Sequence, residues 1–247
     1  MDQIQHNFIN VRGLKLHLAE IGSGPHVVVF LHGFPEIWYT WRHQMMAVAN
    51  TGFRAIAPDY KGYGLSDPPP EPEKATFSDL ISDLLGILDA LQIDKAQLHS
   101  IRTFLKASTF QDGGSEIPIA AENQEIMDLV DPSTPLPPWF TEEDLAAYGA
   151  LYEKSGFQTA LQVPYRTFGE DMIMTDPKVN LPALLIIGGK DYSLKFPGRE
   201  EYLNSGKVKE FVPNLEINFL PEGTHFVHEQ LPDEVNQLIL SFLGKHV

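Results

Sequence analysis

Short apolar runs alternate with helical patterns along most of the chain. Residues 27–31 are five apolar residues, mostly β-branched, a pattern typical of a strand buried on both faces. Similar runs at residues 53–57, 184–187 and 215–220 predict three further strands. Because helical patterns separate these runs, the chain belongs to the α/β class with a mostly parallel sheet.

The remaining pattern predicts a hairpin and several amphipathic helices. Alternation on both sides of Arg12-Gly13 predicts an antiparallel hairpin over residues 6–11 and 14–21. Helical patterns cover residues 38–49, 77–91, 145–155 and 231–243. We expect every apolar residue of the 77–91 helix, Ile81 and Leu85 included, to face the sheet. Thr141 and Asp144 have the spacing of a capping box that opens the 145–155 helix.

The first strand ends at His32-Gly33-Phe34-Pro35, where Gly and Pro break the pattern. Backbone N–H groups at the carboxyl end of a buried strand can face a developing oxyanion. An ordinary strand-to-helix turn is the alternative. We expect the Phe34 N–H to be the donor and the His32 ring to be held by packing.

Asp191 and His225 each follow a predicted strand, with the acid first in the chain. A carboxylate that accepts a hydrogen bond from one imidazole nitrogen fixes the tautomer, so the other nitrogen can take a proton. A histidine after a strand is often a packed or surface residue, but the Lys190-Asp191 pair at a strand end favours a general base. We expect His228 to be exposed.

Composition narrows the range of partners and chemistry. The net charge of −15 argues against nucleic acid and anionic membranes, because both require a basic surface. The absence of cysteine excludes disulfides, thiol catalysis and thiolate metal sites. With no signal-peptide pattern, no long apolar run and no metal or phosphate motif, we expect a cytoplasmic protein without metal or cofactor.

Two segments resemble the plant soluble epoxide hydrolases of the α/β-hydrolase fold. They are HGFPEIWYTWR at residues 32–42 and the loop DYKGYGLSDP at residues 59–68, in which Asp59 and Ser66 are expected to fix the loop. The resemblance implies a mostly parallel sheet with helices on both faces, a helical cap and an acid–histidine pair at Asp191 and His225. It also implies that Tyr165 is a cap tyrosine that donates to the epoxide oxygen, unless it only lines an apolar pocket.

The resemblance fails where the nucleophile should stand. The family's strand runs into a sharp turn that carries the attacking Asp between small residues. In that register this chain has Arg102 for the Asp and Phe104 and Leu105 for small residues. We therefore expect an internal deletion between His99 and about Glu116. It would remove the turn, its helix, one core strand and the front of the cap.

The expected organisation is a core of residues 1–99 and 176–247, with a shortened cap and linker at 100–175. Asp112, in FQDGGS, is the carboxylate weighed as a replacement nucleophile. Phe110 stands where a small residue is required, and Asp-Gly-Gly-Ser is also an ordinary surface turn.

We expect an epoxide hydrolase-like enzyme acting on a small apolar molecule, such as an epoxide or related natural product. Its base is His225 with Asp191, its acid is Tyr165, and its chemistry is non-covalent: isomerisation, cyclisation, elimination or weak hydrolysis. Phe34, Trp38 and Trp139 would line the pocket or simply pack. The alternatives are a non-catalytic small-molecule-binding protein or receptor, and an inactive truncated or spliced product. A homodimer that restores the missing strand by exchange is also consistent with the sequence.

Overall fold

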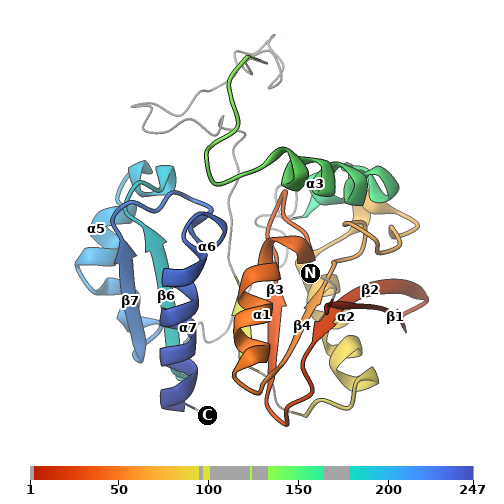
Figure 1. Ribbon diagram of the computed structural model, residues 1–247, viewed down its shortest axis with the longest axis horizontal. Helices are drawn as coiled ribbons and strands as arrows, with labels where there is room; N and C mark the ends of the chain where they lie inside the picture. Colours follow the sequence, from red (N-terminus) through yellow and green to blue (C-terminus); the bar gives the residue numbers. More distant parts are fainter. Residues whose placement is uncertain (1–2, 95–96, 101–122, 124–132, 164–177, 247) are drawn as a thin grey trace. The chain divides into compact units, whose positions relative to one another are not determined.

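The computed structural model describes residues 3–94, 97–100, 123, 133–163 and 178–246. The chain divides into two compact units. The first contains residues 1–102 and 145–175, and the second contains residues 103–144 and 176–246. Each unit has its own sheet (Figure 1).

The first unit contains a five-stranded sheet in the order β1-β2-β4-β3-β5. Its strands are β1 (Gln5–Val11), β2 (Leu14–Ile21), β3 (Val27–Leu31), β4 (Arg54–Pro58) and β5 (Gln97–Ser100). The predicted hairpin is confirmed, since β1 pairs antiparallel with β2. β2 is antiparallel to β4, whereas β3 lies parallel to β4 and β5.

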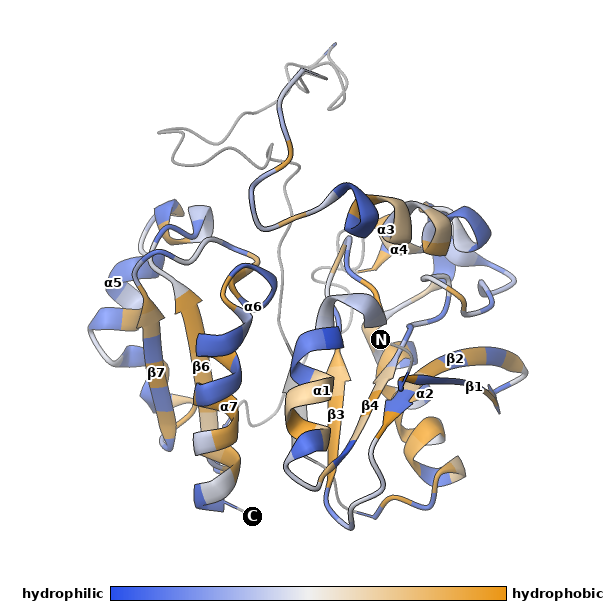
Figure 2. Ribbon diagram, in the orientation of Figure 1, coloured by the Kyte–Doolittle hydropathy of each residue, from blue (hydrophilic) through white to orange (hydrophobic). Residues whose placement is uncertain are grey.

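β3 is the centre of the first unit. All five of its residues are buried, as its uninterrupted apolar run predicts. Val27, Val29 and Leu31 join a core cluster with Ile56 of β4 and residues from β1 and β2. The orange colour of β3 and β4 in Figure 2 follows this core. This packing therefore fixes the position of the carboxyl end of β3.

Helices α1 (Arg42–Asn50) and α2 (Phe77–Ala90) belong to the first unit, together with the short 3-10 helices η1 (Trp38–Trp41) and η2 (Pro72–Lys74). α2 begins at a capping box between Thr76 and Asp79. Its apolar stripe is narrower than expected: Ile81 is 60% and Leu85 is 56% exposed, so our prediction for these two residues was wrong. They lie four positions apart on one side of the helix, beyond the stripe that reaches the sheet.

Within the described residues, the cap consists of helices α3 (Glu142–Ser155) and α4 (Gln158–Gln162). The predicted capping box is confirmed, because the Asp144 N–H donates to Thr141 Oγ1 and the Thr141 N–H donates to Asp144 Oδ2. The buried Tyr63 hydroxyl lies 3.2 Å from the Ala160 carbonyl and 2.9 Å from the Val163 carbonyl. The loop after β4 therefore anchors the shortened cap.

The second unit contains a parallel pair of strands, β6 (Ala183–Gly188) and β7 (Leu215–Leu220). Its register runs from Ala183 opposite Leu215 to Gly188 opposite Leu220. The helices of this unit are η4 (Tyr192–Lys195), α5 (Arg199–Asn204), η5 (Lys207–Glu210), α6 (Val227–Gln230) and α7 (Pro232–His246). No helix in the described ranges combines the length and the apolar character needed to cross a membrane.

The described strands thus form two sheets. Among the residues that the structure describes, β5 pairs only with β3, and β6 pairs only with β7.

Asp59 organises the loop after β4. Its buried carboxylate accepts hydrogen bonds from the Trp38 N–H at 2.8 Å, the Leu65 N–H at 3.1 Å and His17 Nδ1 at 2.8 Å. The Ser66 hydroxyl donates to the Asp59 carbonyl at 2.7 Å. Asp59 and Ser66 therefore fix the loop, as predicted.

We predict that Asp59→Ala lowers the free energy of unfolding by about 3–5 kcal/mol, because two buried donors and one half-buried donor lose their acceptor. Urea denaturation followed by tryptophan fluorescence measures this change. Asp89→Ala, at an exposed position of α2, is the matched control and should change stability by less than about 0.5 kcal/mol. Equal stabilities of the two variants would contradict the assigned role of Asp59.

Candidate active site

His32 locks the loop that follows β3. Its Nδ1 lies 2.8 Å from the Gly33 carbonyl, and its Nε2 lies 3.1 Å from the Tyr60 amide nitrogen. A carbonyl can only accept and an amide N–H can only donate, so the ring is neutral with its proton on Nδ1. Burial lowers the pKa of His32 below the ordinary 6.5, against the opposing charges of Asp59 and Glu36. The ring acts as a structural bridge rather than as a base.

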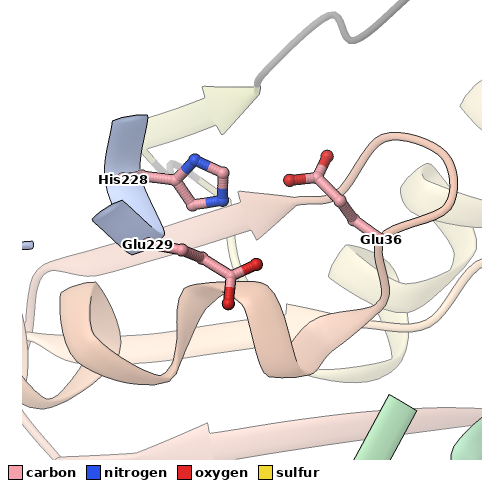
Figure 3. Close-up of side chains that lie close together, drawn as sticks. All are labelled: Glu36, His228 and Glu229. Atoms are coloured by element: carbon pink, nitrogen blue, oxygen red, sulfur yellow. The ribbon is translucent and has the colours of Figure 1, made fainter. Parts of the chain in front are cut away.

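Glu36 lies in the loop after β3 and was not singled out by the sequence analysis. Its side chain projects from the loop after β3 (Figure 3). Oε2 accepts from the Gly33 N–H at 3.1 Å, and Oε1 accepts from the Thr40 hydroxyl at 3.1 Å. The Gly33 N–H therefore faces a carboxylate of its own loop. The three-residue spacing between Gly33 and Glu36 was the sequence signal for a hydrogen bond within this loop.

The predicted pocket aromatics have different surroundings. Trp38 packs in the first unit, with its ring centroid 4.8 Å from that of His6 and 6.2 Å from that of His17. Phe34 meets Phe157 edge-on at 6.3 Å. In the second unit, the half-buried Trp139 lies 6.3 Å from Phe226, the residue that follows His225. Trp38 thus has the contacts of a packed residue, and Trp139 adjoins the segment of His225.

Asp191 and His225 meet in the second unit. His225 Nδ1 lies 2.9 Å from Asp191 Oδ1, and the side chains are 8% and 11% exposed, respectively. Burial alone would raise the pKa of the Asp191 carboxyl. Hydrogen bonds from the His225 ring and the Ser193 N–H, together with the charge of His225, outweigh burial and hold this pKa below the ordinary 3.8. Asp191 is therefore a carboxylate at neutral pH.

Parallel pairing of β6 and β7 brings these two residues together. Gly188 is opposite Leu220 at the carboxyl ends of the strands, and Asp191 and His225 follow these two residues within a few positions. The Gly189 N–H donates to the Leu220 carbonyl at 2.7 Å, and the Lys190 N–H donates to the Gly223 carbonyl at 2.8 Å. A Cβ on Gly188 would lie 2.3 Å from the carbonyl oxygens of Gly223 and Thr224. Only glycine allows the two loops to approach this closely.

The geometry leaves one nitrogen of His225 able to accept a proton. Since Asp191 is ionised, His225 Nδ1 donates to it, and in the neutral ring Nε2 then carries the lone pair. Within the described ranges, the buried Nε2 has no hydrogen-bond partner. Tyr192 and Phe226 flank the ring at centroid distances of 4.7 and 5.3 Å. A positioned carboxylate–imidazole pair of this kind can perform general-base chemistry.

Other predicted residues have different outcomes. Tyr165, Asp112 and Arg102 lie outside the described residues. His228 and Glu229 occupy neighbouring positions on α6 (Figure 3). His228 is 1% exposed, so our prediction of an exposed side chain was wrong. His228 is the second residue of α6, a short helix whose first three residues are all buried.

Comparisons with known proteins agree with this architecture. A family described as alpha/beta hydrolase fold matches residues 26–100. Epoxide hydrolase 3 of Siraitia grosvenorii is 32% identical over 317 aligned positions, which cover 99% of this chain and 100% of that protein. The chain belongs to the epoxide hydrolase family.

Solved structures give the same result for the fold of this epoxide hydrolase family member. A crystal structure of an epoxide hydrolase from Vigna radiata superposes with a TM-score of 0.82 at 25% identity, covering 99% of both chains. A mutant of a Vigna radiata epoxide hydrolase gives a TM-score of 0.84 at 29% identity, covering 99% of this chain and 100% of that one. The α/β-hydrolase fold is thereby confirmed.

This member of the family is short for its relatives. The alignment with the Siraitia grosvenorii protein has 317 positions and this chain has 247 residues, so at least 70 positions have no residue of this chain. The match to the family model also ends at Ser100, just before Arg102, the residue that the sequence analysis places in the register of the attacking Asp.

We predict that Gly188→Ala breaks the Asp191–His225 hydrogen bond, because the new methyl group forces the loop carbonyls away. The downfield Nδ1–H proton resonance of His225 should disappear, as measured by proton NMR in water. Gly244→Ala is the matched control, since a Cβ there meets nothing within 4 Å. An unchanged resonance in Gly188→Ala would show that the close approach does not position the pair.

Proposed function

We propose that this epoxide hydrolase family member acts on a small apolar molecule, with His225 as general base, Asp191 as its orienting carboxylate and no covalent nucleophile. The observation that carries the proposal is the buried hydrogen bond of 2.9 Å between His225 Nδ1 and Asp191 Oδ1. It fixes the ring so that Nε2 is the basic nitrogen.

Support for a missing nucleophile comes from the sequence. Arg102 stands in the register where the family's attacking Asp is expected, and bulky residues flank it. The gap of at least 70 positions against the Siraitia grosvenorii relative provides room for the loss of the whole turn and its helix. Residues 1–99 and 176–247 then form the core, and residues 100–175 form a shortened cap and linker.

The proposed reaction needs only a base and an acid. His225 Nε2 removes a proton from water or from the substrate. In direct hydrolysis, the water oxygen bonds to one epoxide carbon, the bond from that carbon to the epoxide oxygen breaks, and the released oxygen takes a proton. Tyr165 is the proposed proton donor, and the Phe34 N–H is the proposed oxyanion donor. Without water, removal of a substrate proton leads to isomerisation, cyclisation or elimination.

The substrate class follows from the relatives, which are named epoxide hydrolases. We infer a small apolar epoxide or a related natural product, handled in the cytoplasm without metal or cofactor. The aromatic rings of Tyr192, Phe226 and Trp139 near His225 suit an apolar ligand.

A non-catalytic small-molecule-binding protein is the second candidate. The feature that favours it is Arg102, which stands in the register where the family's attacking Asp is expected. A binding protein requires an apolar site but no attacking group.

The test is a single turnover of an aryl epoxide in ¹⁸O-labelled water, with protein in excess. We predict a diol that carries ¹⁸O and a protein whose carboxylates remain unlabelled, because water attacks directly. His225→Gln should lower the rate by at least about 100-fold. His26→Gln, at an exposed position, is the matched control and should keep the full rate.

The other outcomes distinguish the alternatives. Label in a protein carboxylate and an unlabelled first diol would overturn the non-covalent proposal. If no diol or isomer forms and both variants bind the epoxide with unchanged affinity, the binding protein is favoured. If there is neither turnover nor binding, and no cooperative thermal transition, the chain is an inactive truncated product.

A further inference from the structure

We propose that Gln230 is a positioning residue that holds the backbone before His225. Gln230 is the last residue of α6, and its amide side chain reaches back to the loop that leaves β7. The activity readout of this inference rests on the proposed function. The geometric readout does not.

One side chain makes three hydrogen bonds to this loop. Gln230 Oε1 accepts from the Thr224 N–H at 2.7 Å and from the Thr224 hydroxyl at 2.8 Å. Gln230 Nε2 donates to the Glu222 carbonyl at 3.1 Å. The amide therefore bonds on both sides of Gly223, a residue with wide conformational freedom.

The position of Thr224 determines the position of His225. Thr224 directly precedes His225, so fixing its N–H and hydroxyl limits how the next Cα–Cβ bond can point. On the other side of the loop, the Lys190 N–H holds the Gly223 carbonyl and Gly188 packs against the carbonyls of Gly223 and Thr224. Gln230 from one side and the β6 loop from the other clamp the segment in one conformation.

This clamp matters because the Asp191–His225 pair depends on direction as well as distance. Hydrogen bonds weaken steeply when their angle departs from linear. A shift of about 1 Å in a catalytic group is enough to lower a rate by about 100-fold. The amide of Gln230 bonds the neighbours of His225 and not its ring, so it acts through the backbone.

The test compares three variants. Gln230→Met keeps the approximate volume and removes all three hydrogen bonds. Gln230→Glu keeps the oxygen that accepts from Thr224 and loses only the donor to Glu222. Gln237→Met, at an exposed position of α7, is the matched control. Each variant is studied by ¹⁵N NMR of the histidine rings, with the His225 signals identified by their absence in His225→Gln.

In the unaltered protein and in Gln237→Met, we expect His225 to be the Nδ1–H tautomer with a slowly exchanging proton. Gln230→Met should give a mixture of tautomers and fast exchange. It should also lower kcat with an aryl epoxide by about 10- to 100-fold, with little change in KM. Gln230→Glu should recover most of the tautomer preference and of kcat.

The tautomer measurement separates the two proposals. A unique Nδ1–H tautomer that is lost in Gln230→Met supports the positioning role even when no epoxide is turned over, in which case the proposed function alone fails. An unchanged His225 spectrum in folded Gln230→Met would overturn the positioning role. If Gln230→Met does not fold, a Gln230→Glu spectrum with the mixed tautomers would overturn it as well, because that variant keeps both bonds to Thr224.

Discussion

The backbone contact between Gly188 and the carbonyls of Gly223 and Thr224 is the constraint on which the Asp191–His225 pair depends. Parallel pairing of β6 with β7 brings the carboxyl ends of the two strands to one edge of the sheet. This pairing alone does not place the Asp191 and His225 side chains 2.9 Å apart. The absence of a side chain at Gly188 lets the two loops touch. The ionised Asp191 then selects the tautomer of His225, so a packing constraint becomes a chemical one.

A different device holds the first unit together. The buried carboxylates of Asp59 and Glu36 accept hydrogen bonds from backbone N–H groups of the loops that follow β3 and β4. Such N–H groups would otherwise be buried without partners, which costs free energy. The conformations of both loops are therefore fixed by hydrogen bonds to these two carboxylates and not by apolar packing alone.

Much of this fold could be predicted because its strands are short, apolar and separated by clear helical patterns. The run at residues 27–31 is buried along its whole length, and the pairing of Asp191 with His225 follows from their places after neighbouring parallel strands. The errors concern surfaces. Ile81 and Leu85 are apolar but exposed. Periodicity predicts which side of a helix faces the sheet, but not how much of that side the sheet covers.

Glu36 and Gln230 were missed for a related reason. Each acts through hydrogen bonds to backbone groups three to eight positions away, and polar residues at such spacings are common on any surface. Only the three-dimensional path of the loop shows which of these polar side chains form hydrogen bonds to the backbone. His228 was assigned to the surface because it matches no motif position of the family, whereas the first three residues of α6 are all buried.

The central claim is that the base and its carboxylate persist without an attacking group. Acid quenching of His225→Gln, after mixing with excess aryl epoxide, followed by intact-protein mass spectrometry, tests this claim most directly. In a covalent hydrolase the ester would accumulate, because the base that removes it is missing. We predict a protein of unchanged mass. A stoichiometric increase by the mass of one epoxide, located by peptide mapping on an Asp or Glu, would contradict the claim.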